Sequence, residues 1–271
     1  MKIGVVVKLD DNNIDARFKQ VKDYGFDCCQ LIGWKFELFT DEIAEMVNAA
    51  CEKYGVTIST FWCGWSGPRV WDFMEGPVTL GLVPMDYRNE RIKDLKKGSD
   101  FAKKIGVKNV ATHVGFLPEC PNTMEYHSLV CAIREVAQYC KDNEQNFLFE
   151  TGQETPVTLL RTIQDIGLDN VGINLDPANL ILYGKANPVD ALDVFGKYVM
   201  DVHAKDGIYP VDGKELGEEK KIGDGKVNFE KLIPRLKEVG YDKTLIIERE
   251  ISGDQQIVDI KNAKVFLEEL I

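Results

Sequence analysis

The chain has 271 residues, of which 44% are hydrophobic and 28% charged, and its formal net charge is −11. This composition is typical of a globular protein that buries a sizeable core, and the length suits one large domain or two small ones. The acidic balance argues against a nucleic-acid or anionic-membrane partner, because phosphate contacts need clustered lysine and arginine side chains.

The seven cysteines include no C-x-x-C pair, so the sequence indicates neither a disulfide framework nor a zinc ribbon. No apolar run approaches the roughly 18 residues of a membrane span. The chain enters its first strand directly after Met1, without a signal-peptide pattern. We therefore expect a cytoplasmic protein with no membrane partner, and we leave open whether it forms a homo-oligomer.

Apolar, β-branched runs alternate with amphipathic helical patterns along the whole chain. Capping signals mark several of the helices. Thr40 and Gly55 bracket one apolar helical face, and Thr155 and Asn187 each precede a proline that suits the first turn of a helix. Pro234 lies inside the helix expected over residues 228–239 and predicts a late start or a kink there. Strands are expected over residues 5–7, 28–34, 56–62, 107–113, 147–150, 171–176, 199–203 and 244–248.

Two segments are less regular. The first helix, with Ile14, Phe18 and Val21 at helical spacing, follows the candidate caps Asp11, Asn12 and Asn13. Residues 63–87 contain several glycines and prolines and predict a long loop, with the next helix over residues 92–105.

Eight βα units of roughly 34 residues each predict an α/β fold, a single-domain (β/α)8 TIM barrel over residues 1–271. An open, doubly wound sheet is the alternative. Such a sheet usually carries a nucleotide-binding glycine motif after its first strand. The stretch Val7-Lys8-Leu9-Asp10 has no such motif, so the barrel is favoured.

Four consecutive predicted strands end in side chains that bind metals: Glu150, Asp176, His203 and Glu248. In a barrel, the C-terminal ends of all strands meet on one face. Three carboxylates that converge without a cation would repel one another and raise their own pKa values, so a divalent cation is the economical explanation. The mostly hard-oxygen donor set favours Mn²⁺, which we expect, or Mg²⁺ or Co²⁺, with Zn²⁺ as a further alternative.

Each of these residues also has a purely structural explanation. Asp176 precedes Pro177 and could open a turn or cap a helix. Glu248 could pair with Arg249 or a nearby lysine, and His203 could be a buried core histidine. Taken singly, the residues leave these alternatives open, whereas the joint pattern favours a metal site.

Four blocks of sequence surround these strand ends: Phe-Glu-Thr-Gly-Gln-Glu (149–154), Asn-Leu-Asp-Pro-Ala-Asn (174–179), Val-His-Ala-Lys-Asp-Gly (202–207) and Ile-Glu-Arg-Glu (247–250). Together with residues 223–229, they resemble the xylose-isomerase-like TIM-barrel superfamily, and more narrowly its sugar (phosphate) isomerase/epimerase branch. The resemblance covers essentially the whole chain. It implies a divalent metal bound by Glu150, Asp176, His203 and Glu248, with Glu150 and Glu248 also acting as acid/base groups.

Such a site suits proton transfer on a ketose whose carbonyl is polarised by a metal. A carboxylate removes the proton beside the carbonyl to give an enediolate. Return of the proton to the same carbon from the opposite face is epimerisation, and return to the neighbouring carbon is isomerisation. We therefore expect a metal-dependent sugar isomerase or epimerase acting on a ketose or related polyol.

Three other functions are considered. An inosose-type dehydratase would use the same metal site. An apurinic-site endonuclease needs a histidine-rich zinc cluster and a basic face, which three histidines and a net charge of −11 argue against. A non-catalytic barrel could instead bind a sugar or a protein partner.

Substrate contacts are expected from residues near the strand ends: His113, Lys205, Asn179, Trp62 and Glu154. His113 could instead be structural or an extra metal ligand, as in the endonuclease branch, and Lys205 could pair with Asp206. Trp62, like Trp34 and Trp65, could simply pack in the core, and Glu154, with Gln153, could support Glu150.

Two features bear on the substrate. Tagatose-type epimerases often carry a histidine where this chain has Asn179, so their substrate preference does not transfer directly. Lys220, Lys221 and Arg249 are the only basic residues placed to meet a phosphate, and none belongs to a glycine-rich cradle. A free sugar or polyol is therefore at least as well supported as a sugar phosphate.

Overall fold

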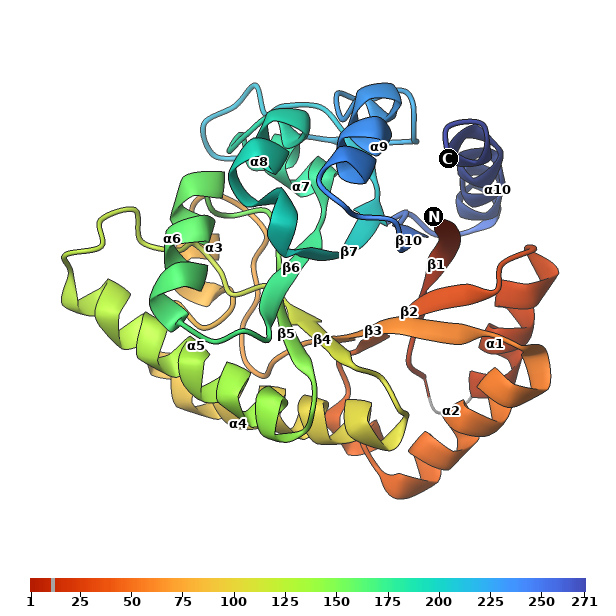
Figure 1. Cartoon of the computed structure of the whole chain (residues 1–271), viewed down its shortest axis with the longest axis horizontal. Helices are drawn as coiled ribbons and strands as arrows, with labels where there is room; N and C mark the ends of the chain where they lie inside the picture. Colours follow the sequence, from red (N-terminus) through yellow and green to blue (C-terminus); the bar gives the residue numbers. More distant parts are fainter. Residues whose placement is uncertain (11–12) are drawn as a thin grey trace.

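Eight parallel strands close into a barrel in the computed structural model, which describes residues 1–10 and 13–271 (Figure 1). The closed order is β1-β10-β7-β6-β5-β4-β3-β2. The predicted single TIM-barrel domain is thereby confirmed. The strands are Lys2–Lys8 (β1), Cys28–Gly33 (β2), Thr57–Cys63 (β3), Asn109–Thr112 (β4), Asn146–Glu150 (β5), Val171–Leu175 (β6), Val199–Ala204 (β7) and Thr244–Ile247 (β10).

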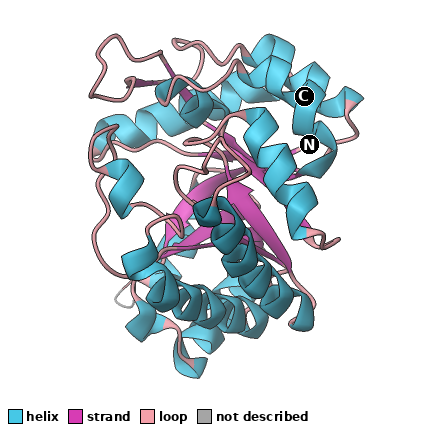
Figure 2. Cartoon of the chain, turned by 90° about the vertical axis from the view of Figure 1, so that its left-hand side faces the viewer, coloured by secondary structure: helices cyan, strands magenta, loops and turns pink. Residues whose placement is uncertain are grey.

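Helices surround the strands on the outside (Figure 2), and the two ends of the chain lie close together (Figure 1). None of the described helices combines the length and the apolar character that a bilayer span requires. The helices are Ile14–Asp23 (α1), Asp41–Tyr54 (α2), Gly76–Thr79 (α3), Met85–Lys104 (α4), Met124–Asp142 (α5), Pro156–Ile166 (α6), Pro177–Leu182 (α7), Pro188–Phe195 (α8), Phe229–Glu238 (α9) and Asp254–Glu268 (α10).

The predicted capping residues occupy the helix ends. The Thr40 hydroxyl accepts a hydrogen bond from the Ile43 N–H at 3.2 Å, and Asn187 Oδ1 accepts one from the Val189 N–H at 2.9 Å. Gly55 ends α2 with a φ of 64°, a conformation that glycine adopts without a steric penalty. Asn13 sits at the cap position of α1 without a side-chain capping bond, and the other two candidates, Asp11 and Asn12, lie outside the described residues.

The loop predicted over residues 63–87 is shorter than expected, because it contains α3 and because α4 begins at Met85. The first turns of α4 bury arginines instead of apolar side chains. Arg88 Nε donates to the Leu82 carbonyl and Arg91 Nη1 to the Gly81 carbonyl, both at 2.6 Å. A search for apolar periodicity misses a helix face that is buried through such hydrogen bonds.

Pro234 lies inside α9 without delaying it, since the helix begins at Phe229 directly after the cap Asn228. Two other short elements were not predicted from the sequence. One is α7, and the other is an antiparallel pair formed by Asp206–Gly207 (β8) and Glu219–Lys220 (β9).

Two apolar clusters hold the barrel together. The larger one joins strand side chains to the helices, with fully buried members such as Phe18, Phe101 and Phe147. The smaller one comprises Ile32, Trp62, Trp65, Leu80, Ala111 and Leu148. Burial of this surface from water is the main stabilising contribution to such a fold.

The loops after β3 and β7 meet, although these strands lie opposite each other in the closed order. The Phe73 N–H donates a hydrogen bond to the Lys214 carbonyl at 3.2 Å. The Phe73 ring also packs edge-on against Tyr183, with ring centroids 6.2 Å apart. We call this connection the loop bridge, defined by Phe73, Tyr183 and Lys214.

Candidate metal centre and active site

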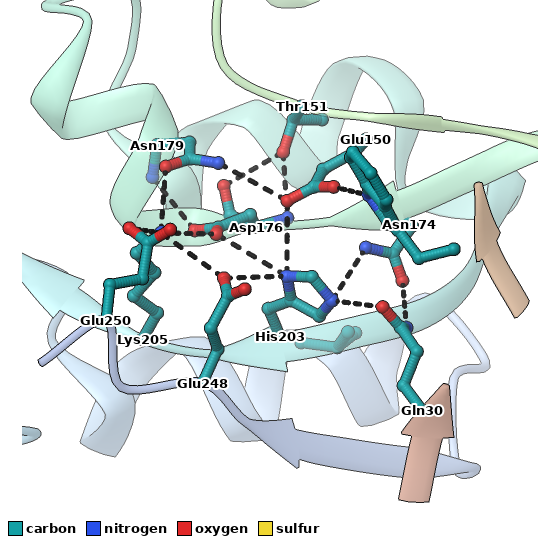
Figure 3. A network of polar contacts seen from close by, with 12 residues as sticks. Gln30, Glu150, Thr151, Asn174, Asp176, Asn179, His203, Lys205, Glu248 and Glu250 are labelled. Atoms are coloured by element: carbon teal, nitrogen blue, oxygen red, sulfur yellow. Dashed lines mark hydrogen bonds and ion pairs between the residues drawn. The ribbon is translucent and has the colours of Figure 1, made fainter. Parts of the chain in front are cut away.

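Four strand ends bring the predicted ligands together around one imidazole nitrogen (Figure 3). His203 Nδ1 lies 3.3 Å from Glu150 Oε1, 3.5 Å from Asp176 Oδ2 and 3.3 Å from Glu248 Oε2. One ligand atom from each of the four residues lies within 4.8 Å of the others. Glu150 ends β5 and His203 lies in β7, while Asp176 and Glu248 directly follow β6 and β10.

Asp176 uses its two carboxylate oxygens differently. Oδ1 caps α7 by accepting a hydrogen bond from the Asn179 N–H at 2.9 Å. Oδ2 is buried, has no hydrogen-bond partner and points toward the cluster. The capping role and the ligand role that the sequence left open are therefore compatible, because each oxygen serves one of them.

The cluster fits a divalent cation. His203 Nδ1 and Asp176 Oδ2 are both buried without a hydrogen-bond partner, a costly arrangement that a cation would remedy. Burial alone would lower the pKa of His203, but the Glu248 and Glu150 carboxylates raise it well above its usual value. One nitrogen with three carboxylates is a donor set that suits Mn²⁺ or Mg²⁺.

Lys205 neutralises the side of the cluster nearest Glu248. Its Nζ lies 3.2 Å from Glu248 Oε2, 2.6 Å from Glu250 Oε2 and 3.6 Å from Asp176 Oδ2. Although burial opposes it, the Lys205 and His203 charges hold the pKa of Glu248 below its usual range. Lys205 directly follows β7, two residues after His203, and its side chain extends toward the same acids as the His203 ring.

The alternative partner of Lys205, Asp206, is engaged elsewhere. Its carboxylate accepts hydrogen bonds from the backbone N–H groups of Gly223, Gly225 and Val227 at 3.0 to 3.1 Å. A side chain at position 225 would collide with Asp206, since a Cβ there would lie 2.0 Å from Oδ1. Asp206 therefore holds the loop over residues 223–227 against the end of β7.

Aromatic side chains line the Glu150 side of the site. The Trp62 indole N–H donates to Glu150 Oε2, and His113 Nε2 lies 3.4 Å from Glu150 Oε1. The Trp71 and His113 ring centroids lie 5.2 Å apart. Because Trp71 is 39% exposed, these aromatic side chains extend from Glu150 to the surface. We call this set the aromatic wall, and it consists of the four tryptophans of the chain and one histidine: Trp34, Trp62, Trp65, Trp71 and His113.

Asn179 and Glu154 flank Glu150. Asn179 Nδ2 donates to Glu150 Oε1 at 3.4 Å, and Asn179 Oδ1 accepts from Lys205 Nζ at 3.4 Å. Glu154 is buried after β5, its Oε1 has no hydrogen-bond partner, and burial raises its pKa to about 8. Asn179 thus connects the two sides of the cluster, whereas the structure shows no contact of Glu154 with it.

Buried polar atoms without a partner concentrate at this end of the barrel. Of the eight such atoms among residues 1–10 and 13–271, only Asn170 Oδ1 lies at the other end, just before β6. The others are Trp65 Nε1, His113 Nδ1, both amide atoms of Gln153, Glu154 Oε1, Asp176 Oδ2 and His203 Nδ1. Since buried polar groups in proteins are nearly always hydrogen-bonded, this concentration indicates a site for a polar ligand.

The three basic residues considered for a phosphate are all paired with acids. Arg249 contacts Glu219 and Asp259 at 3.0 and 2.8 Å. Lys220 pairs with Glu218, and Lys221 lies 3.3 Å from Asp224. These pairs reduce the positive charge that a phosphate would meet.

Several residues around the cluster were not found from the sequence. Gln30 and Asn174 contact the far side of the His203 ring, Asp201 accepts a hydrogen bond from Gln30, and Glu250 pairs with Lys205. Gln30 and Asn174 are single polar residues within otherwise apolar strands, and Asp201 lies two residues before His203 in β7. That pattern is the signal that could have identified them.

The model of the xylose isomerase-like TIM barrel family matches residues 18–270 of the chain, which therefore belongs to this family. A xylose isomerase domain protein from Planctomyces limnophilus is 34% identical, with a TM-score of 0.93 over 99% of this chain and 96% of that one.

Two further proteins are more distantly similar to this chain. An uncharacterized protein of Methanocaldococcus jannaschii is 28% identical over 68% of this chain, and the chain spans 64% of that relative's length. A D-tagatose 3-epimerase-like protein is 21% identical, covers 100% of this chain and 97% of its own, and has a TM-score of 0.76. At 21% identity, this similarity shows a shared fold alone.

Proposed function

We propose that the protein is a metal-dependent sugar epimerase or isomerase that acts on a ketose or related polyol. One observation carries the proposal: Glu150 and Glu248 each place a carboxylate oxygen 3.3 Å from His203 Nδ1, from strands β5 and β10. In Figure 3 the two carboxylates reach the same ring nitrogen from different directions. Two such groups suit removal of a proton on one side of a substrate and its return on the other.

Glu150, Asp176, His203 and Glu248 would hold the cation, with Mn²⁺ as the expected ion. When bound there, a divalent cation polarises a carbonyl and acidifies the adjacent C–H bond. The similarity in fold to a D-tagatose 3-epimerase-like protein supports a carbohydrate substrate.

The side chains around the cluster have distinct proposed roles in this reaction. Glu248 is kept ionised by Lys205 and is available as the base. Glu150, which reaches the cluster from β5, returns the proton. Lys205 Nζ is placed to donate a hydrogen bond to the enediolate oxygen, because it lies within 3.6 Å of both Asp176 and Glu248.

The aromatic wall and the unpartnered polar atoms support an uncharged, hydroxyl-rich substrate. Aromatic faces pack against the C–H face of a sugar, and Trp65 Nε1 and His113 Nδ1 remain available for its hydroxyl groups. His113, Trp62, Asn179, Lys205 and Glu154 are the proposed substrate contacts. The acid-paired Arg249 and Lys220 offer little to a phosphate.

The test is a panel of free ketoses and keto-polyols incubated in D₂O with the Mn²⁺-loaded protein, and read by proton NMR after the metal is removed. We expect solvent deuterium at one carbon beside the carbonyl. A chelator should abolish the exchange and added Mn²⁺ should restore it. Exchange that persists after metal removal would contradict the proposal, and a conjugated product would indicate the dehydratase instead.

A further inference from the structure

The second ring nitrogen of His203 faces a buried polar group on the far side of the barrel. Nε2 lies 2.7 Å from Gln30 Oε1, and Gln30 is fully buried on β2. In Figure 3, Gln30 and Asn174 lie on one side of the imidazole, while Glu248 and Asp176 lie on the other. The two ring nitrogens therefore have separate surroundings, one amide-rich and one acidic.

The orientation of the Gln30 amide is set by its other contacts. Gln30 Nε2 donates to Asp201 Oδ2 at 3.2 Å and to Asn174 Oδ1 at 3.0 Å. Asp201 Oδ2 also accepts hydrogen bonds from the Ser59 and Thr60 hydroxyl groups, so the Gln30 NH₂ group, as a donor, faces this acceptor oxygen. Gln30 Oε1 is then the atom that faces His203 Nε2, at 2.7 Å, whereas the Asn174 amide nitrogen lies farther from Nε2, at 3.2 Å. The shorter contact, to an acceptor, favours a hydrogen on Nε2.

Asp201 is itself held in place by several donors. Its Oδ2 accepts from Ser59 Oγ at 2.7 Å and Thr60 Oγ1 at 2.6 Å, and its Oδ1 accepts from Thr244 Oγ1 at 2.5 Å. The interior of a TIM barrel is usually filled with branched apolar side chains, and a fully buried carboxylate is costly there. Several donors from neighbouring strands compensate this cost and leave Asp201 in one orientation.

We propose that Asp201 and Gln30 form a relay that fixes the tautomer of His203. The relay places the hydrogen on Nε2 and directs the free electron pair of Nδ1 toward Glu150, Asp176 and Glu248, where it can bind a cation. Gln30 and Asp201 are positioning residues, since neither touches the cation or substrate. This inference rests on the proposed metal site.

The first test compares Gln30→Met with Gln145→Met. Gln145 is also a buried, hydrogen-bonded glutamine, but it lies just before β5, at the end of the barrel away from the cluster. Calorimetric titration with Mn²⁺ should show an affinity roughly 10- to 100-fold weaker for Gln30→Met, the usual effect of losing a partner of a ligating histidine. Gln145→Met should match the wild-type protein.

The second test uses the unmodified protein and so does not depend on the folding of a variant. Long-range proton–nitrogen NMR of the Zn²⁺-loaded protein distinguishes the two tautomers. The chain has only three histidines, which single substitutions can assign. We expect His203 to carry its hydrogen on Nε2, with Nδ1 as the metal-bound nitrogen.

The outcomes separate the relay from the metal site itself. If the wild-type protein binds neither Mn²⁺ nor Zn²⁺, the proposed function fails and the relay with it. If the wild-type protein binds metal but Gln30→Met binds it equally well, or if His203 carries its hydrogen on Nδ1, only the relay is overturned.

Discussion

Lys205 and Glu248 form an ion pair at the centre of the candidate site, with Nζ 3.2 Å from Oε2 and 3% and 12% of the two side chains exposed. A buried pair of this kind contributes little net stability, because desolvation of the charges offsets their attraction. Its consequence is electrostatic, since Lys205 favours the ionised form of the carboxylate that we propose as the base.

Replacing Lys205 with methionine should therefore change the pH dependence of the reaction. Without the positive charge, the pKa of Glu248 rises toward its ordinary value, and the acid limb of the pH–rate profile moves to higher pH. Deuterium exchange into a ketose, measured from pH 4 to 9, checks this. Lys220→Met, which removes a lysine that is paired outside the cluster, is the control. An unshifted acid limb would contradict the role of Lys205.

The two glutamates of the cluster should both be required for exchange. Glu150→Gln and Glu248→Gln should each reduce the rate by about 10²- to 10⁴-fold, the range for loss of a general acid or base. Mn²⁺ affinity should be measured for both variants, because either change also removes a proposed ligand charge. Glu238→Gln, on the exposed face of α9, is the matched control. Full activity in either cluster variant at saturating Mn²⁺ would exclude that residue as an acid/base group.

Glu154 should make the stability of the protein depend on pH. Burial raises its pKa to about 8 in the folded protein, from an ordinary value of 4.5. The unfolded chain therefore loses this proton first as the pH rises. The contribution of Glu154 to the free energy of unfolding is therefore fully present below pH 4.5. It decreases by about 1.4 kcal/mol for each pH unit between 4.5 and about 8.

Glu154→Gln removes this titration, so the variant should gain stability relative to the wild-type protein as the pH increases from 5 to 8. Urea unfolding of both proteins at the two pH values measures the difference. The same test with Glu238→Gln, an exposed acid, should show little pH-dependent gain. A constant difference between Glu154→Gln and the wild-type protein would show that Glu154 titrates normally.

Trp71 should affect substrate binding more than the chemical step. It is the exposed end of the aromatic wall and packs against His113, so Trp71→Ala should raise KM with a smaller change in kcat. Trp71→Phe keeps an aromatic face and should retain most of the affinity. Steady-state kinetics with the ketose that reacts fastest would give KM and kcat for both variants. Equal losses in both variants would argue against packing of the ring on a sugar.

The sequence was sufficient to predict the barrel and the four residues of the cluster, because both follow from the order of strands. Each of the four residues lies at the end of its own strand, and barrel closure brings these ends together. The start of α4 was missed because Arg88 and Arg91 occupy its buried face. The partners of His203 were missed for another reason: Gln30 reaches it from β2 across the barrel, and no local pattern reports such a contact.

The loop bridge limits how this barrel can be altered. The hydrogen bond from the Phe73 N–H to the Lys214 carbonyl joins loops from opposite strands, so a change in one loop removes a contact of the other. Transplanting a foreign loop after β3, in order to change which sugars are accepted, would also remove the support of the loop after β7. The two segments form one exchangeable unit, and a redesign should replace them as a pair.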